Sequence, residues 1–246
     1  MIQSLLRNIP TITKNLLIIN VIFFVATFLF ESRGIDLKQM LGMHYPSSQY
    51  FQPYQIFTHF FMHADLMHIL FNMVGLVIMG SHLERMWGEK KYLFFYIVTA
   101  LGAALLYALI QGVEVYNLTG EFFPEIEILN LEYVGNGLVT YNYEPSGDGY
   151  RAVTKIYLSN SLGASGAVYG LLMAFALLFP NTEFMLLFPP IPIKAKWLAL
   201  GLGVIALYSG IKNAQGDTVA HFAHLGGMLF GFILVKIWQK QRNNFY

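Results

Sequence analysis

Apolar residues form six stretches along the chain, each near the roughly 20 residues that a helix needs to cross a bilayer. The second, fourth and sixth stretches are interrupted by His, Asn, Ser and Gly, whereas the other three are almost wholly apolar. Polar groups at such positions indicate helices packed inside a bundle or helices that line a site. The pattern predicts an all-α, polytopic membrane protein with six spans, at about 15–31, 64–83, 92–112, 164–180, 195–211 and 219–238.

The composition agrees with this pattern. The chain is 56% hydrophobic and 12% charged, about half the charge of a typical soluble domain. A net charge of +1 gives no footprint for nucleic acid. The absence of cysteine excludes disulfides, thiolate metal sites and cysteine nucleophiles. No small-residue cleavage site follows the first stretch, so we expect it to be a retained span.

Basic residues predict the orientation. Ten of the fifteen lie on one side of a six-span arrangement, which predicts that both termini are cytoplasmic. Two long segments, about 32–62 and 113–160, then lie on the other side. The first is too aromatic for a free linker, and we expect it to lie partly in the membrane interface. The second is acidic, and its alternating segments allow a small hairpin.

A serine begins the fourth stretch, within Gly163-Ala164-Ser165-Gly166. Its small neighbours leave the hydroxyl accessible, and the free N–H groups at a helix start suit an oxyanion formed from an attacked carbonyl. The alternative is ordinary helix packing, because Gly166 and Gly170 form a small-xxx-small pair. Ser165 is therefore a candidate nucleophile.

Two histidines three residues apart, His221 and His224, begin the sixth stretch. Gly227 and Gly231 follow and would let this helix approach another closely, such as the helix of Ser165. A histidine placed there can accept the serine proton. We favour His224 as the base because it is next to the glycines. The alternatives are two histidines with other partners, or half of a metal site.

The second stretch contains a further polar group. His68 and Asn72 are four residues apart and share one helix face, and both can donate hydrogen bonds to a developing oxyanion. His63 precedes them, and Asp65 and Glu84 are possible metal ligands. The H-E-x-x-H motif of many zinc enzymes is absent. We expect no metal and no cofactor, with a metal-dependent membrane hydrolase as an alternative.

Four of these motifs occur in a fixed order: His63 to Asn72, Glu84 to Gly88, Gly163 to Gly170 and Ala223 to Gly231. Together they resemble the rhomboid family of intramembrane serine proteases. The resemblance extends from about His59 to Gly231. It implies a six-transmembrane-helix rhomboid-like bundle, a single domain over 1–246 with a core at about 54–238.

The resemblance also implies roles for the candidates. Ser165 would be the nucleophile and His224 its base. His68, Asn72 and the backbone N–H of Ser165 would form the oxyanion hole. No third acidic residue is required, and none lies within the fourth or sixth stretch. A dyad of this kind works when the base lies within hydrogen-bond reach of the hydroxyl.

Other positions would support the dyad. Tyr169 would pack against the catalytic histidine and orient it, and Glu84 would brace the first loop from within the bundle. One departure is Tyr54-Gln55, where family members often carry Trp-Arg. The second loop is also longer than the family core needs. The remaining supporting positions are His63, Gly163, Gly166 and Gly227.

The implied activity is endoproteolysis of single-span transmembrane proteins within the lipid bilayer. The implied location is the bacterial inner membrane, with both termini cytoplasmic and no nucleic acid partner. A polar cavity would open outward between the first loop and the connection at 208–218. The first alternative is a catalytically inert rhomboid-like protein that binds transmembrane segments. The second is a small transporter, although no repeated halves are visible.

Overall fold

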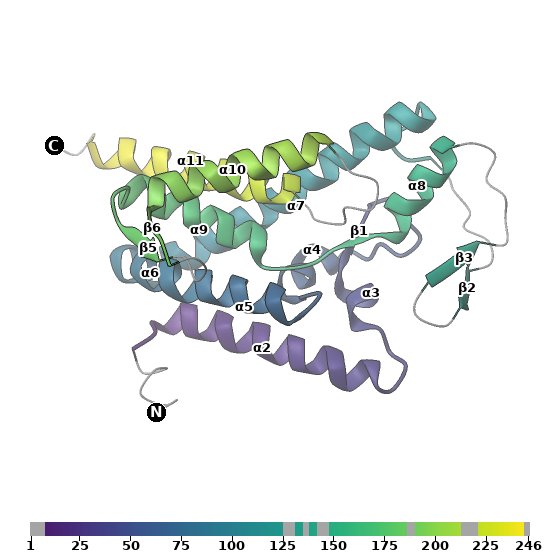
Figure 1. The fold of residues 1–246 in the computed structure, drawn as a ribbon, viewed down its shortest axis with the longest axis horizontal. Coiled ribbons are helices and arrows are strands. Elements are labelled where there is room, and N and C mark those ends of the chain that lie inside the picture. The colour runs from purple at the N-terminus through teal and green to yellow at the C-terminus, as the bar shows by residue number, and fades with distance from the viewer. Residues whose placement is uncertain are drawn as a thin grey trace.

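The computed structural model describes residues 8–124, 131–134, 138–141, 148–185, 190–212 and 221–243. Its framework is a bundle of long helices, with short helices and strands at one end and a further short hairpin at the other (Figure 1). The long elements are α2 (Thr11–Glu31), α5 (Leu66–Gly75), a π-helical turn (Leu76–Gly80), α6 (Ser81–Trp87), α7 (Glu89–Thr119), α9 (Ser165–Leu178), α10 (Ala195–Lys212) and α11 (His221–Asn243).

Among the residues that the structure describes, five helices are long and apolar enough to cross a membrane, so the chain is a multi-pass membrane protein. They are Thr11–Glu31, Leu66–Trp87, Glu89–Thr119, Ala195–Lys212 and His221–Gln241. The fourth predicted span differs, because α9 has 14 residues. At about 1.5 Å per residue it is roughly 21 Å long, less than a hydrocarbon core of about 30 Å. The predicted count of six spans therefore stays a prediction.

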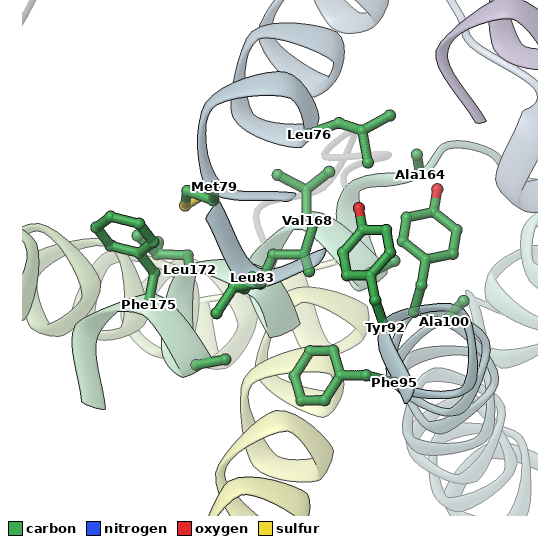
Figure 2. Packing of buried hydrophobic residues seen from close by; sticks show 14 of the residues in the cluster. Leu76, Met79, Leu83, Tyr92, Phe95, Ala100, Ala164, Val168, Leu172 and Phe175 are labelled. Carbon is green, nitrogen blue, oxygen red and sulfur yellow. The ribbon is translucent and has the colours of Figure 1, made fainter. Parts of the chain in front are cut away.

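Helix α9 lies in the middle of the bundle, in contact with α5, α7, α10 and α11. In Figure 2 its residues Val168, Leu172 and Phe175 meet Leu76, Met79 and Leu83 on one side and Tyr92 and Phe95 on the other. Nine of the ten residues labelled there have exposed fractions of 6% or less, and Val168 is 9% exposed. This packing surrounds the short helix with longer ones.

Helices α5–α6 and α9 run parallel. The ring of His82 contacts Phe175, and Gly75 faces Val168. The two contacts are seven residues apart on each segment, so the two helices run in the same direction. Asn72 lies one turn before Gly75, and Ser165 lies one turn before Val168. Asn72 and Ser165 are therefore at similar depth in the bundle.

Helix α2 is fixed at its start by a carboxylate from another helix. Pro10 precedes the helix, and no side chain caps it locally. Glu84, which is 3% exposed, accepts hydrogen bonds from the backbone N–H groups of Ile12 and Thr13 at 2.8 and 2.7 Å. An acidic group is favourable there because the helix start carries partial positive charge. The expectation that Glu84 braces the first loop was wrong.

The first loop, residues 32–62, is folded rather than a free linker, as expected. Gly42 packs so tightly against Leu162 and Asn160 that a methyl group there would lie 2.6 Å from the Leu162 side chain. Its elements are α3 (Leu37–Leu41), β1 (Met43–His44), α4 (Gln55–Thr58) and a 3-10 turn (His59–Phe61).

The second loop differs from its predicted bounds. Helix α7 has 31 residues and continues to Thr119, past the expected end near 112. The suggested hairpin is present as β2 (Leu131–Val134) paired with β3 (Leu138–Tyr141). Helix α8 (Asp148–Leu158) was not anticipated. Strand β4 (Asn160–Ser161) follows it and pairs with β1.

The opposite end of the bundle carries a second hairpin, β5 (Glu183–Met185) with β6 (Pro192–Lys194). In Figure 1 it lies on the left, where α2 begins and α11 ends. The first loop and α8 lie on the right. The connection expected to cap the site falls largely on residues 213–220, which are outside the described residues.

Candidate active site

The side chains of Ser165 and His224 meet between α9 and α11. His224 Nε2 lies 2.9 Å from Ser165 Oγ. Ser165 is the first residue of α9 and His224 lies in the first turn of α11, so both come from the same end of parallel helices. Both side chains are half-buried. A neutral imidazole whose Nε2 accepts from the hydroxyl must carry its proton on Nδ1.

Gly227 and Gly231 of α11 lie against the backbone of Gly166 and Gly170 of α9, and we call these four residues the glycine seam. A methyl group at Gly227 would overlap the carbonyl oxygen of Gly166. One at Gly231 would lie 2.8 Å from the carbonyl oxygen of Gly170. Small residues allow such close backbone approach, which drives helix association where lipid removes the hydrophobic effect. The seam therefore sets the distance between the helices of the pair.

Tyr169 lies one turn after Ser165 and stacks on the imidazole of His224. The ring centroids are 4.1 Å apart and the planes differ by 3°. This stack fixes the plane of the imidazole from the α9 side. In a three-residue unit an acidic residue orients the imidazole differently, by accepting a hydrogen bond from Nδ1–H.

His68 comes from α5 and lies against the turn that precedes α9. Its Nδ1 is 3.4 Å from the backbone N–H of Ala64 and accepts from it, so a neutral ring carries its proton on Nε2. A methyl group added at Gly163 would lie 2.7 Å from His68 Nε2. The Nε2–H donor thus faces the backbone two residues before Ser165.

Gly163 has φ +116°, a conformation that side chains other than glycine rarely adopt. Its N–H donates to the carbonyl of His59 at 2.9 Å, which ties the turn to the first loop. Both the backbone angle and the space beside His68 require glycine here.

Asn72 is buried and lies one helical turn after His68. One amide N–H of its side chain donates to the His68 carbonyl at 2.8 Å. The second N–H is left for another acceptor. Because Asn72 and Ser165 stand at similar depth on adjacent parallel helices, this amide lies on the same side of the bundle as the serine.

His63 is fully buried, and its ring packs against that of His68 at a centroid separation of 5.0 Å and an interplanar angle of 68°. Burial, reinforced by the neighbouring His68, lowers the pKa of His63 to about 4. Its imidazole is therefore neutral at pH 7. The neutral His63 ring thus packs edge-on against the His68 ring.

A small cavity adjoins the serine. Its lining includes His59, Ser161, Gly163, Ser165, Gly166 and Ala223. The first loop, β4 and the glycine seam therefore all border one recess, whose lining is partly polar and partly apolar.

Sequence comparison identifies the family. Residues 50–241 match the family model described as the Rhomboid domain, which covers the bundle from the first loop through α11. The chain belongs to the rhomboid family.

Curated relatives agree with this membership. The rhomboid protease GlpG of Yersinia pestis (strain Pestoides F) is 27% identical over 187 residues, 71% of this chain. GlpG of Yersinia pseudotuberculosis (strain IP32953) matches to the same extent. The chloroplastic rhomboid-like protein 16 of Arabidopsis thaliana is 26% identical over 182 residues, 72% of this chain. The matched region spans 65% of the length of the GlpG proteins and 47% of the plant protein.

One residue of this rhomboid has a larger part than its sequence suggested. Gln55 stands where the family often has Arg, and it is 1% exposed. Its Oε1 accepts from the backbone N–H of His44 and Gln52, and its Nε2 donates to the carbonyls of Met40 and Tyr50. Gln55 thus anchors the first loop from within. The presence of Gln55 at a position where the family often has Arg is the sequence feature that could have indicated this role.

His221, the other histidine of this helix, does not take part in the Ser165–His224 hydrogen bond. It lies in the same turn as His224, with ring centroids 6.3 Å apart. Among the residues that the structure describes, no three His, Asp or Glu side chains come together as a metal site.

Proposed function

We propose that this rhomboid is an intramembrane serine endopeptidase in which Ser165 is the nucleophile and His224 the general base. The observation that carries the proposal is the 2.9 Å separation of His224 Nε2 and Ser165 Oγ inside a helical membrane bundle. This distance is a normal hydrogen bond, the reach that a base needs. Membership of the rhomboid family and the protease names of the bacterial relatives support it.

In the first step, Ser165 Oγ attacks the carbonyl carbon of the scissile peptide while its proton passes to His224 Nε2. The resulting tetrahedral intermediate carries a negative oxygen. It collapses to an acyl-enzyme on Ser165 as the C–N bond breaks, and His224 returns the proton to the leaving amine. Water then attacks the ester with His224 again as base, which releases the acid and regenerates the serine.

Three donors would stabilise the oxyanion: the backbone N–H of Ser165, the Nε2–H of His68 and the free side-chain N–H of Asn72. The first is one of the unpaired N–H groups at the start of α9. The tautomer of His68 and the single internal hydrogen bond of Asn72 leave both side-chain donors available. Loss of one such donor typically costs about a hundredfold or more in rate.

The substrates would be single-span transmembrane proteins, cut near the outer membrane face of a bacterial inner membrane. Both termini would be cytoplasmic, the whole chain would form one domain, and no cofactor would be needed. Ser165, the first residue of the short α9, would lie below the bilayer surface. Because a helical peptide bond is shielded, helix-breaking residues near the cleavage site should favour cleavage.

The test is cleavage of a model single-span substrate by purified protein in lipid vesicles. Ser165→Ala should abolish cleavage. Ser159→Ala is the matched control, because its hydroxyl caps α8 by donating to the Ile156 carbonyl and lies outside the dyad. Undiminished cleavage by Ser165→Ala would refute the proposal. Wild-type protein that binds the substrate without cutting it would favour the inert rhomboid-like alternative.

A further inference from the structure

Tyr157, near the end of α8, joins three segments that are distant in sequence. Its side chain is 1% exposed. Its hydroxyl donates to the carbonyl of Pro124 at 2.8 Å and therefore accepts from the hydroxyl of Ser47 in the first loop. The hydroxyl of Ser48 donates to the backbone carbonyl of Tyr157 at 2.7 Å. We call Tyr157, Ser47, Ser48 and Pro124 the tyrosine junction.

An apolar cluster covers the ring side of this junction. The Tyr157 ring packs beside that of Tyr45, at a centroid separation of 5.6 Å. Val115 from α7 and Val153 from α8 join the contact, and both are fully buried. The hydrogen bond from Ser48 is buried and the two at the Tyr157 hydroxyl are partly buried, so all three are shielded in part from water.

The chain that leaves the junction stays attached to the first loop until it reaches Ser165. Strand β4 pairs with β1, with Asn160 opposite His44 and Ser161 opposite Met43. The side-chain amide of Asn160 donates to the Lys38 carbonyl at 2.9 Å. Two residues beyond β4, the N–H of Gly163 donates to the His59 carbonyl. The junction is thus the first of four successive attachments that end beside the serine.

We propose that Tyr157 is a positioning residue for the reaction: its hydroxyl holds the first loop and β4 in the register that sets the Gly163–Ser165 turn against His68. The inference rests on the proposed function, since it concerns the reactivity of the same serine. It assigns a role to α8, which lies outside the helices that form the Ser165–His224 pair.

Two substitutions isolate the hydroxyl pair. Tyr157→Phe keeps the ring and its packing and removes one oxygen, and Ser47→Ala removes the partner hydroxyl while the tyrosine stays intact. Ser47→Thr keeps a hydroxyl and should restore the wild-type rate. The matched controls are Tyr116→Phe, an exposed tyrosine near the end of α7, and Ser159→Ala, directly after α8.

The experiment measures the rate at which a fluorophosphonate labels Ser165, together with kcat and KM for a model transmembrane substrate. Ser47→Ala should lower the labelling rate and kcat about fivefold, the effect of one net hydrogen bond. Tyr157→Phe should lower them at least as much, because it also removes the hydrogen bond to Pro124. KM should stay unchanged, and no fall in melting temperature should account for the lost rate. The double variant should be no slower than Tyr157→Phe alone, because that substitution already removes the bond with Ser47.

The outcomes separate this inference from the proposed function. If wild-type protein is neither labelled at Ser165 nor active, the proposed function fails. If it is active and Tyr157→Phe and Ser47→Ala label as fast as the two controls, the positioning role of Tyr157 is wrong. A fall in melting temperature that accounts for the lost rate, with no rescue by Ser47→Thr, would also overturn it.

Discussion

The glycine seam and the first loop are held in place by different kinds of contact. Along the seam, backbone meets backbone, and a methyl group at Gly227 would overlap the carbonyl of Gly166. Around the first loop, side chains bind backbone groups instead, as Gln55 does with four hydrogen bonds. Inside the bilayer, helices associate through close packing because lipid is as apolar as the side chains. In the first loop the chain is irregular, and buried polar contacts fix its backbone.

The difference teaches where each kind of damage should appear. Changes in the seam should alter the distance between Ser165 and His224 and the stability of the bundle together. Changes in the first loop should leave the bundle folded and alter the turn at Gly163.

Gly227→Ala should be the most damaging single substitution. The added methyl group has no space, and overpacking of this kind costs about 1–3 kcal/mol of unfolding free energy and would separate α9 from α11. We expect a lower melting temperature and loss of proteolysis. Gly201→Ala on α10 is the matched control, since a methyl group there meets nothing within 4 Å. Equal behaviour of the two variants would contradict the role of the seam.

Gly163→Ala should abolish activity with less effect on the melting temperature. The substitution places a methyl group 2.7 Å from the His68 ring and strains a residue with φ +116°. Gly120→Ala separates these causes, because φ is +80° there but the surroundings are open. Cleavage rate and melting temperature are measured for both. A fully active Gly163→Ala enzyme would refute the proposed geometry of the turn.

Gln55→Ala should loosen the first loop without unfolding the bundle. It removes four hydrogen bonds from a buried site, each worth about 1 kcal/mol net. Hydrogen exchange within residues 32–62 should accelerate, while exchange within α9 and α11 should not. Gln52→Ala, which leaves the Gln55 side chain in place, is the control. Acceleration spread evenly over the whole chain would show that loop and bundle are not separable.

Mild acid should loosen the same loop by a smaller amount. Burial lowers the pKa of His59 and of His63 to about 4, below the ordinary value of 6.5. Between these values the unfolded loop binds more protons than the folded one, so folding stability is complete above pH 6.5 and falls as the pH drops toward 4. Hydrogen exchange of residues 32–62 should therefore rise from pH 7 to pH 5, after correction for the intrinsic rate. His63→Gln should weaken this dependence, and a pH-independent wild-type loop would contradict it.

The same contrast explains what the sequence could predict. Apolar stretches and glycine spacing predicted the long helices, because local composition largely determines a membrane span. The Ser165 and His224 motifs indicated the close approach of α9 and α11. The partner of Glu84 lies 71 to 72 residues away in sequence, and no local pattern links the two.

Helix α8 was missed for a related reason. It is short, and its apolar face consists of few residues, among them Val153, Ile156 and Tyr157. Those residues find their partners in the first loop and α7, so tertiary contacts rather than local preference stabilise the helix. No local sequence pattern links Tyr157 with Ser47, Ser48 or Pro124, so the tyrosine junction is visible only in the folded structure.

The central claim is that Ser165 and His224 act as one catalytic unit, and it is tested most directly by locating a fluorophosphonate adduct by mass spectrometry. We expect an adduct on Ser165 in wild-type protein and in His221→Ala. We expect no adduct in His224→Ala at equal time and dose, although this variant should melt at the same temperature as wild type. Equal labelling of Ser165 in His224→Ala, or an adduct on another serine, would contradict the claim.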